Sequence, residues 1–591
     1  MTIRERIEKL RDLMKNQEIQ AWIVPSADPH QSEYVADRWK SRAWISGFTG
    51  SAGTVVIMQD KAGLWTDSRY FIQAAKELEG SGIKLFKMKV EGVPEMEEWL
   101  KNQLNDGDTV GFDGKCMSIS QTNDLKEKLG GGINFKTDLD LIDQIWQNRP
   151  PVPMAEIENY PAELCGEDRQ EKIKRVREKM KEKDSDGYLI TALDSVAWLY
   201  NIRGEDVEYN PVAIAYGFIS DEQAYFFIKD EKMNSGMKEK LSADKIKIKD
   251  YDEIIGFLSS LNDKKVLIDP GKTSIRLKSA LPDSCEIKED TDLVTVMKAV
   301  KNETELEGFR KAHIKDGVAL VKWLKWLEET AGNTALNEWK IAEKLAEFRS
   351  QQENYRGESF HPIIGYKENG AIVHYSPSKD ESEKVGGEGV LLTDTGGQYF
   401  EGTTDITRTF SLGNPTKREK EIFTMVLKGH IDLAKARFPK GYTGKMIDTF
   451  AGAPLWAKGH NYKHGTGHGI GQYLNVHDGA SYYQIRRSID TELKPGMVMS
   501  NEPGCYLEGE FGVRVENIVI VTEKETTDAG TFYGFETISF CPIDLKLIEK
   551  SAMTEAEIDW LNNYHQKVYE KLEPYLSDDE KVWLKEKTKA I

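Results

Sequence analysis

The amino-acid sequence predicts an α/β (α+β) protein, in which two related N-terminal mixed-sheet domains with helices precede a third domain that carries the reactive side chains. Three observations predict this fold class. The chain has 591 residues, more than the about 250–300 at which a single hydrophobic core stops growing. β-rich runs alternate with helical runs, and the same order of runs occurs twice before residue 300. Hydrophobic residues make up 39% of the chain, which provides enough apolar surface for several cores.

The first predicted domain covers residues 1–150 and begins with a helix. Ile3, Ile7, Leu10 and Met14 recur there at helical spacing among charged residues. The segments AWIVP, GTVVIMQ, AGLWTDSRYFIQAAKELE and DTVGFDG then alternate β-rich and helical runs, which is typical of a mixed or parallel sheet covered by helices. The prolines of QNRPPVPMAE remove backbone donors and predict a boundary near residue 150.

The second predicted domain covers residues 151–299 and repeats the pattern of the first. Each contains a strand, a loop, an Ala-Trp pair, a glycine turn and two further strands in the same order. Such self-similarity indicates a repeated structural unit. We therefore expect the second domain to be a duplicate of the first.

Two helix-capping signals divide the remainder into a third domain, residues 300–545, and a C-terminal helical extension, residues 546–591. In each signal, a residue that can cap a helix is followed three residues later by glutamate. The pairs are Asn302 with Glu305 and Thr554 with Glu557. Apolar side chains then line one helical face of the extension, at Ile558, Leu561, Val568 and Leu572. This helix is long enough to pack on the third domain or on a second subunit.

Composition excludes several classes of partner and location. The net charge of -18, from 80 Lys+Arg against 98 Asp+Glu, provides no basic stripe for nucleic acid. The five cysteines have no paired spacing, so neither a disulfide framework nor a zinc knuckle is expected. The sequence shows neither an export signal nor a stretch of about 18 apolar residues that could span a bilayer. We expect a cytoplasmic protein without a membrane or nucleic-acid partner.

The histidines cluster in the third domain, which points to a functional site there. Seven of the ten lie between positions 361 and 477. Three of them belong to the segment HGTGHGIGQYLNVH, where glycine at alternate positions lets the backbone approach a ligand and excludes a regular helix. These three are expected on a strand or loop. The seven are His361, His374, His430, His460, His464, His468 and His477.

Acidic side chains flank the same region of the sequence. Asp394 ends one apolar strand and Asp405 lies inside a second strand of a predicted hairpin, so the two carboxylates can meet across a strand pair. Glu502 ends a further apolar run, and Arg514 and Glu516 are expected on one face of a single strand. Some have a simpler interpretation, because either aspartate alone could be a turn or edge residue and Arg514 could pair with Glu516. Such a pair would leave Glu502 unexplained.

Taken together, these carboxylates predict a centre with two metal ions. Asp394, Asp405, Glu502 and Glu516 would repel one another if they met without cations, whereas two divalent ions offset their charge. Mostly oxygen ligands with one imidazole, His468, favour manganese, although cobalt or zinc can compete.

The motifs resemble those of the pita-bread metallopeptidases. D(x10)D within GTTDITRT, HGTGHGIG, NEPG and GVRVEN occur in that family's order, and the whole chain resembles its three-domain cytosolic aminopeptidases P. DPHQSEY, SGFTGSAGT and WTDSRYF look like the non-catalytic modules of that family. The resemblance implies a C-terminal pita-bread catalytic domain whose bridging metal ligands are Asp405 and Glu516. The full set of implied ligands is Asp394, Asp405, His468, Glu502 and Glu516.

The resemblance also implies an activity, which is release of the first residue from peptides whose second residue is proline, and a homodimer. Glu502 would be the general base, and His374 and His477 would donate to the developing oxyanion. His464, with His374 and His477, would contact substrate, and Tyr506 and Arg514 would border the proline pocket. Cys505 departs from the bulkier residue expected after NEPG, and His361 has no assigned contact.

Three other interpretations stay open at this point. A prolidase would cleave only Xaa-Pro dipeptides and needs a group that holds their carboxylate. A creatine-degrading amidinohydrolase shares the fold but works without metal, so the presence of all five ligand types argues against it. A catalytically silent peptide-binding module typically loses ligand residues, whereas this sequence retains them all.

Overall fold

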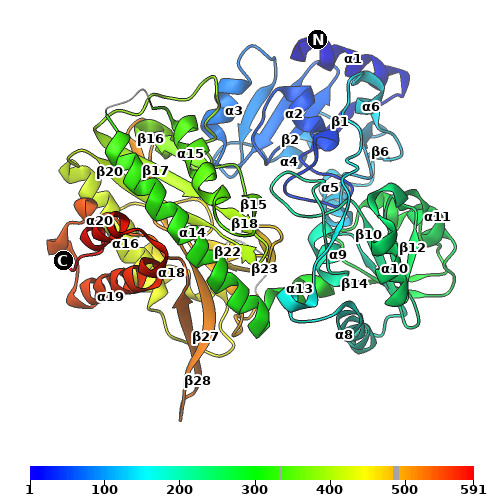
Figure 1. The fold of residues 1–591 in the computed structure, drawn as a ribbon. Coiled ribbons are helices and arrows are strands. Elements are labelled where there is room, and N and C mark those ends of the chain that lie inside the picture. The colour runs from blue at the N-terminus through cyan, green and yellow to red at the C-terminus, as the bar shows by residue number, and fades with distance from the viewer. Residues whose placement is uncertain (333–335, 484–490) are drawn as a thin grey trace. The chain divides into compact units, whose positions relative to one another are not determined.

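The computed structural model describes residues 1–332, 336–483 and 491–591. These form two compact units, one of Met1–Pro161 with Glu167–Val296 and one of Ala162–Gly166 with Met297–Ile591 (Figure 1). The two predicted N-terminal domains share the first unit, and the third domain and the extension share the second. The finer boundaries at residues 150, 299 and 545 stay predictions.

A six-stranded mixed sheet organises the first part of the N-terminal unit. Strand β1 pairs antiparallel with β2 and parallel with β5, and β2 pairs antiparallel with β3. The outer strands β4 and β6 pair parallel with β3 and β5, respectively. Trp22 and Val24 of β1 pack in one apolar cluster and Ala21 and Ile23 in another, so the sheet is buried on both faces. In spatial order the strands are β4 (Lys84–Lys87), β3 (Ala62–Thr66), β2 (Thr54–Met58), β1 (Ala21–Pro25), β5 (Thr109–Phe112) and β6 (Asn134–Lys136).

Helices cover this sheet, and the predicted N-terminal helix is confirmed. Helix α1 (Ile3–Asn16) buries Ile7, Leu10 and Met14, and Thr2 caps it in a capping box with Glu5. The other helices here are α2 (Ser41–Ser46), α3 (Phe71–Glu77), α4 (Met96–Lys101), α5 (Ile119–Leu129) and α6 (Leu141–Ile145).

A second six-stranded sheet repeats the first. Taken in chain order, the strands of each sheet stand in the spatial order 4-3-2-1-5-6, and their parallel and antiparallel pairings are the same. The expected duplication is therefore confirmed. The second sheet runs β12 (Ile246–Lys249), β11 (Ala224–Phe227), β10 (Tyr216–Ser220), β8 (Gly187–Ile190), β13 (Lys265–Ile268) and β14 (Glu286–Glu289). Its helices are α8 (Arg169–Glu182), α9 (Leu193–Leu199), α10 (Ser235–Ala243), α11 (Ile254–Ser259) and α12 (Ile275–Lys278).

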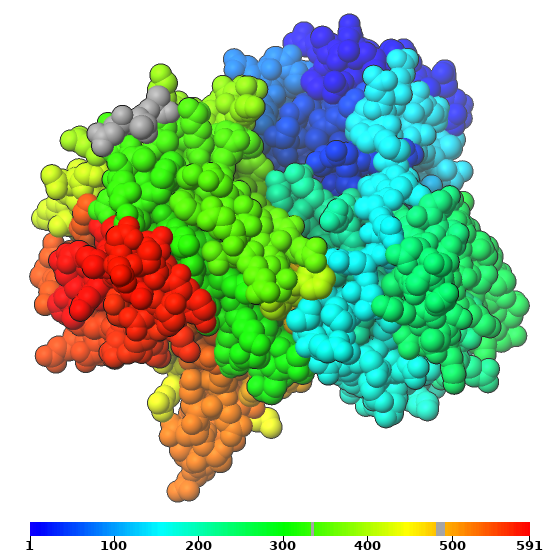
Figure 2. All heavy atoms as spheres, in the orientation of Figure 1, coloured from blue at the N-terminus to red at the C-terminus, as the bar shows by residue number. Residues whose placement is uncertain are grey.

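The C-terminal unit combines long helices with several antiparallel sheets. The predicted capping box of Asn302 with Glu305 opens α14 (Glu303–Thr330), which is followed by α15 (Glu338–Ser350) and, later, α16 (Lys417–Ala434). One six-stranded sheet runs β21 (Phe438–Pro439), β28 (Gly530–Thr537), β27 (Asn517–Thr527), β24 (Val498–Asn501), β22 (Gly467–Gly469) and β23 (Asp478–Tyr483). The outer half of the β27–β28 hairpin is exposed and forms the orange projection in Figure 2.

Smaller sheets complete this unit. One three-stranded sheet consists of β16 (Ile363–Tyr366), β17 (Gly389–Thr395) and β20 (Ile406–Leu412). Another consists of β15 (Tyr355–Glu358), β18 (Gly397–Tyr399) and β19 (Gly402–Thr403), and the strands of the two sheets are interleaved along the sequence. Strands β25 (Gly504–Leu507) and β26 (Phe511–Arg514) form a hairpin. In the described ranges 1–332, 336–483 and 491–591, no helix has the length and apolar character needed to cross a membrane.

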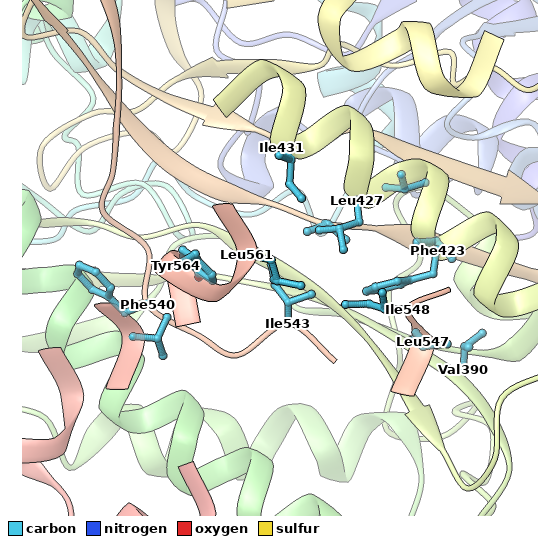
Figure 3. Packing of buried hydrophobic residues seen from close by; sticks show 14 of the residues in the cluster. Val390, Phe423, Leu427, Ile431, Phe540, Ile543, Leu547, Ile548, Leu561 and Tyr564 are labelled. Carbon is cyan, nitrogen blue, oxygen red and sulfur yellow. The ribbon is translucent and has the colours of Figure 1, made fainter. Parts of the chain in front are cut away.

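The C-terminal extension packs on its own unit. Helix α19 (Glu555–Leu572) begins with the predicted capping box of Thr554 with Glu557 and buries Leu561, Val568 and Leu572. Figure 3 shows Leu561 among the buried side chains of the cluster that also contains Leu427 of α16. Each fully buried leucine contributes about 1.5–3 kcal/mol. A short helix, α20 (Asp578–Lys587), follows. The extension is therefore part of the core of the C-terminal unit.

Candidate metal centre

The two aspartates meet at the end of the β17–β20 strand pair, as predicted. Asp394 lies in β17 opposite Thr407 of β20. Asp405 was expected inside the second strand, and this detail is wrong, because Asp405 lies one residue before β20. The physical reason is the small β18–β19 hairpin, which Thr404 closes by donating its N–H to Gly397 O at 2.9 Å. Regular pairing with β17 starts only after that turn.

His468 and Glu516 complete a compact cluster with Asp405. One ligand atom of each lies within 4.8 Å of those of the other two. His468 Nε2 is 3.4 Å from Asp405 Oδ2 and 3.5 Å from Glu502 Oε1. His468 Nδ1 lies 2.9 Å from Gly469 O, so it carries the proton and leaves the Nε2 lone pair for a cation. His468 stands on strand β22, in agreement with the strand or loop expected from the alternating glycines.

Arg514 and Glu516 do not share one strand as expected. Strand β26 ends at Arg514 and β27 begins at Asn517. Glu516 between them donates its N–H to Thr407 O at 3.1 Å and its carboxylate accepts from Thr407 Oγ1 at 2.6 Å. These bonds to Thr407 of β20 thus separate β26 from β27. The Arg514 guanidinium instead bonds Asp394 Oδ2 at 2.5 Å, which replaces the simple Arg514–Glu516 pair.

The electrostatics of the cluster are those of carboxylates that need cations. Burial raises the pKa of Asp405 well above its usual range, and the charge of Asp394 raises it further. Burial and the charge of Asp405 do the same to the pKa of Glu516. Asp394 Oδ1 is buried and, within the described part of the chain, has no hydrogen-bond partner. Divalent cations would relieve both features, so the donor set fits a metal centre.

Glu502 is more exposed than the two aspartates. Its side chain is 17% exposed, against 11% for Asp394 and 6% for Asp405. Burial raises the pKa of Glu502 to about 7, and the nearby charges of His468 and Arg514 oppose that rise. Ser500 Oγ donates to Glu502 Oε1 at 3.3 Å. Without cations Glu502 therefore titrates near neutral pH, and cations bound beside it would lower its pKa.

The predicted substrate-contacting residues surround this cluster. Tyr506 OH lies 2.8 Å from His464 Nε2 and accepts from Arg514 Nη1 at 2.5 Å. The rings of His477 and His468 meet edge to face with centroids 4.3 Å apart. His374 follows Val373, whose carbonyl accepts from both terminal nitrogens of Arg514 at 3.4 Å. These contacts link His464, Tyr506 and Arg514 to one another and His477 to His468, and they place the backbone next to His374 against Arg514.

The two residues without an assigned role, His361 and Cys505, have aromatic and apolar neighbours. His361 faces Trp339, with ring centroids 6.5 Å apart. Cys505 is buried in an apolar cluster with Phe511, and its sulfur lies 3.9 Å from His460 Nδ1. Burial raises the pKa of Cys505 to about 11, so this thiol is a poor nucleophile.

Sequence reasoning missed several supporting residues. Lys298 and Lys301 both donate to Asp478, the neighbour of His477. Although burial alone would raise the pKa of Asp478, the two lysines hold it well below its usual range. Because Lys301 and Asp478 stand 177 positions apart, no local pattern could have paired them. For Thr407, which donates to Glu516, the sequence offers only a weak signal, namely its position two residues after Asp405.

A further missed residue connects this centre to the C-terminal helix. Arg408 donates through Nη1 to Glu516 O at 2.6 Å and through Nη2 to Asn517 Oδ1 at 2.8 Å. The same Nη2 donates to Tyr564 OH, on α19, at 2.7 Å. One buried arginine therefore joins α19 to the backbone of Glu516, one of the predicted metal ligands.

Family models match almost the whole chain. Metallopeptidase family M24 matches residues 307–523, and the C-terminal region of peptidase M24 matches residues 531–591. The Creatinase/Prolidase N-terminal domain matches twice, over residues 6–145 and 148–305. These matches agree with the two duplicated sheets followed by a pita-bread domain.

Curated and solved relatives extend over the full length. A probable Xaa-Pro aminopeptidase P of Laccaria bicolor is 41% identical over 600 residues, which cover 98% of this chain and 92% of the relative. The X-prolyl aminopeptidase of Caenorhabditis elegans, described as a cytosolic enzyme with a di-nuclear active site, is 34% identical, with a TM-score of 0.96 and coverage of 100% of both chains. An Xaa-Pro dipeptidase of Bacillus anthracis, at 24% identity and a TM-score of 0.52, covers 64% of this chain and 99% of its own and shares the fold. The chain belongs to the Xaa-Pro aminopeptidase P family, with a catalytic domain of metallopeptidase family M24.

Proposed function

We propose that this protein hydrolyses the bond between an N-terminal residue and a penultimate proline, with two divalent cations at the cluster described above. The observation that carries the proposal is the convergence of Asp405, His468 and Glu516 within 4.8 Å, beside Glu502. The names of the full-length relatives support the substrate class. The five residues that would hold the cations are Asp394, Asp405, His468, Glu502 and Glu516.

Manganese is the proposed metal, because four carboxylates and one imidazole make a largely oxygen-based ligand set, although cobalt or zinc could also occupy it. Bound cations would lower the pKa of a water molecule and polarise the scissile carbonyl. The buried, unpartnered Asp394 Oδ1 supports a role for Asp394 as a ligand, since the other oxygen of this carboxylate is already taken by Arg514.

Glu502 is the proposed general base. Its carboxylate is partly exposed, and its Oε1 lies 3.5 Å from His468 Nε2, so beside bound cations it can accept a proton from water and pass it to the leaving nitrogen. His374 and His477 are proposed to donate to the developing oxyanion, and His464 to contact substrate. Tyr506 and Arg514 would form the wall of the proline pocket, because Tyr506 OH is fixed between His464 and Arg514.

Substrate comparison tests this proposal against the prolidase alternative. We expect the metal-loaded protein to release the first residue from an Xaa-Pro-Xaa tripeptide. An Xaa-Ala-Xaa tripeptide should be cleaved at least about tenfold less efficiently, because even one missing methylene in a shaped apolar pocket lowers kcat/KM by about 10–200-fold. The measurement is kcat/KM for these two tripeptides and for the Xaa-Pro dipeptide. Cleavage of the dipeptide alone would establish a prolidase, and bound metal without any turnover would indicate a silent binding module.

We also propose a homodimer, formed through an apolar surface of the C-terminal unit. Four large apolar side chains around α17 (Gly444–Ile447) and α18 (Thr449–Trp456) are exposed, namely Tyr442, Met446, Phe450 and Trp456. Patches of this kind mark interaction sites in soluble proteins. Sedimentation at micromolar concentration should give twice the 67.1 kDa chain mass, and M446E with F450E should give the monomer. V582E, at an exposed site on α20, is the control. A wild-type monomer would contradict the proposal.

A cytoplasmic location is proposed on two grounds. All five cysteines are free thiols, which suits a reducing compartment. The Caenorhabditis elegans relative is described as cytosolic.

A further inference from the structure

The segment that carries His374, residues 367–388 between β16 and β17, folds around one buried carboxylate. That carboxylate belongs to Glu338, the first residue of α15, which is 0% exposed. Its Oε1 accepts from Tyr366 N at 2.8 Å and from Asn369 Nδ2 at 3.0 Å. Its Oε2 accepts from Tyr375 OH at 2.7 Å and from Glu383 N at 3.0 Å. One side chain therefore holds the start, the middle and the end of the segment.

The backbone strengthens this arrangement at the base of the segment. Glu338 N donates to Glu383 O at 3.1 Å, and Val385 N donates to Leu336 O at 2.9 Å. Hydrogen bonds to a charged group contribute about 1.5–3 kcal/mol each, and loss of an acceptor leaves its donors buried without a partner. Burial raises the pKa of Glu338, and its four donors oppose that rise. Four converging donors fit a carboxylate, which only accepts, and do not fit an amide.

His374 lies between two anchors. On one side, Val373 O accepts from the Arg514 guanidinium, which also bonds Asp394. On the other side, Tyr375 OH donates to Glu338. The backbone of the segment is also packed tightly against β26, since a Cβ atom added at Gly512 would lie 1.8 Å from Gly370 O. The position of the His374 backbone thus depends on the metal-site arginine and on Glu338.

We infer that Glu338 is a positioning residue, which holds His374 at the distance from the metal centre that oxyanion stabilisation requires. This inference rests on the proposed function and adds to it a residue that is neither a proposed metal ligand nor a proposed substrate contact. Its physical basis is that a misplacement of about 1 Å, even when caused far from the chemistry, can lower a rate by about 10²-fold. Glu338 contacts no reacting atom, so its effect must pass through His374.

A double-mutant cycle tests the inference. E338Q keeps the shape of the side chain but turns one accepting oxygen into an NH₂ group, so that two of the four donors lose their acceptor. We expect E338Q to lower kcat for an Xaa-Pro-Xaa tripeptide by about 10–100-fold with KM nearly unchanged. H374A should lower kcat by about 10²–10³-fold. The E338Q/H374A double variant should match H374A alone, because the misplaced group is then already absent. Multiplication of the two losses would overturn the inference.

Two further measurements separate positioning from general damage. E343Q makes the same chemical change at an exposed site of α15 and should leave kcat and stability unchanged. Y375F removes a single hydrogen bond to Glu338 and should lower kcat by roughly tenfold with a melting temperature within a few degrees of wild type. It replaces E338Q in the cycle if that variant does not fold.

Hydrogen exchange of residues 366–383 provides a readout that does not depend on turnover. E338Q, or Y375F in its place, should accelerate exchange in this segment, including the amide of Glu383, and leave exchange in the β27–β28 hairpin unchanged. Unchanged exchange in the segment would refute the anchoring role of Glu338. An inactive wild-type protein would refute the proposed function, but it would leave this measurement of the anchor intact.

Discussion

E502Q is expected to lower kcat for an Xaa-Pro-Xaa tripeptide by about 10²–10⁴-fold, the range that a positioned general acid–base group contributes. Glutamine preserves the size of the side chain and an oxygen that can face a cation, but it cannot take a proton. Glu502 suits the role because its carboxylate is 17% exposed and its Oε1 lies 3.5 Å from Nε2 of His468, another proposed ligand. The measurement is release of the first residue at saturating manganese, so that a weaker metal ligand does not lower the observed rate.

E508Q is the matched control, since Glu508 is an exposed glutamate in the β25–β26 hairpin and should keep full activity. Metal content of E502Q, measured on the same sample, separates loss of the base from loss of the cations. A variant that binds two metal ions and retains more than a tenth of the wild-type kcat would show that the proton goes to another group.

Exhaustive chelation is expected to abolish turnover and to lower the melting temperature, and divalent manganese should restore both. A ligand that binds only the folded state stabilises it by about 4 kcal/mol at about 1,000 times its Kd. The effect of chelation should also depend on pH. Without cations, the folded state holds Glu502 with a pKa raised from 4.5 to about 7, so it binds more protons than the unfolded chain between these values. The stability of chelated protein must then fall as pH rises through that window.

The raised pKa values of Asp405 and Glu516 act in the same direction. The melting temperatures of chelated and manganese-loaded protein should therefore separate further as pH increases. E516Q removes the most buried proposed ligand and should abolish the response to manganese, whereas E523Q, an exposed position on β27, should keep it. Full activity after chelation would favour the metal-independent alternative of the same fold.

Much of the fold could be predicted because its signals are local. Ile7, Leu10 and Met14 mark the buried face of α1 by their spacing alone, and the capping boxes at Asn302 and Thr554 fix the starts of α14 and α19. The duplication was visible because both N-terminal sheets arise from the same order of strands and turns. These features depend on residues within a few positions of each other.

The site was predictable in residue type and less so in detail. Asp405 falls outside its strand because the β18–β19 hairpin ends just before it. Glu516 lies in a break between two strands because its backbone pairs with Thr407 instead of continuing a regular strand. Glu338 was missed for another reason. Its partners lie 28 to 45 positions away, and a glutamate at the start of a helix is locally unremarkable because it suits the helix dipole.

The contact of Arg408 with Tyr564 has a genetic consequence. Because Arg408 also holds the Glu516 carbonyl and Asn517, a premature stop codon between Glu516 and Tyr564 would remove one wall of the arginine's binding site while leaving every proposed ligand encoded. Such a truncated allele would still encode every proposed metal ligand and yet behave as a null allele. A survey of loss-of-function alleles should therefore find nonsense changes in the final coding segment as damaging as substitutions in the ligands themselves.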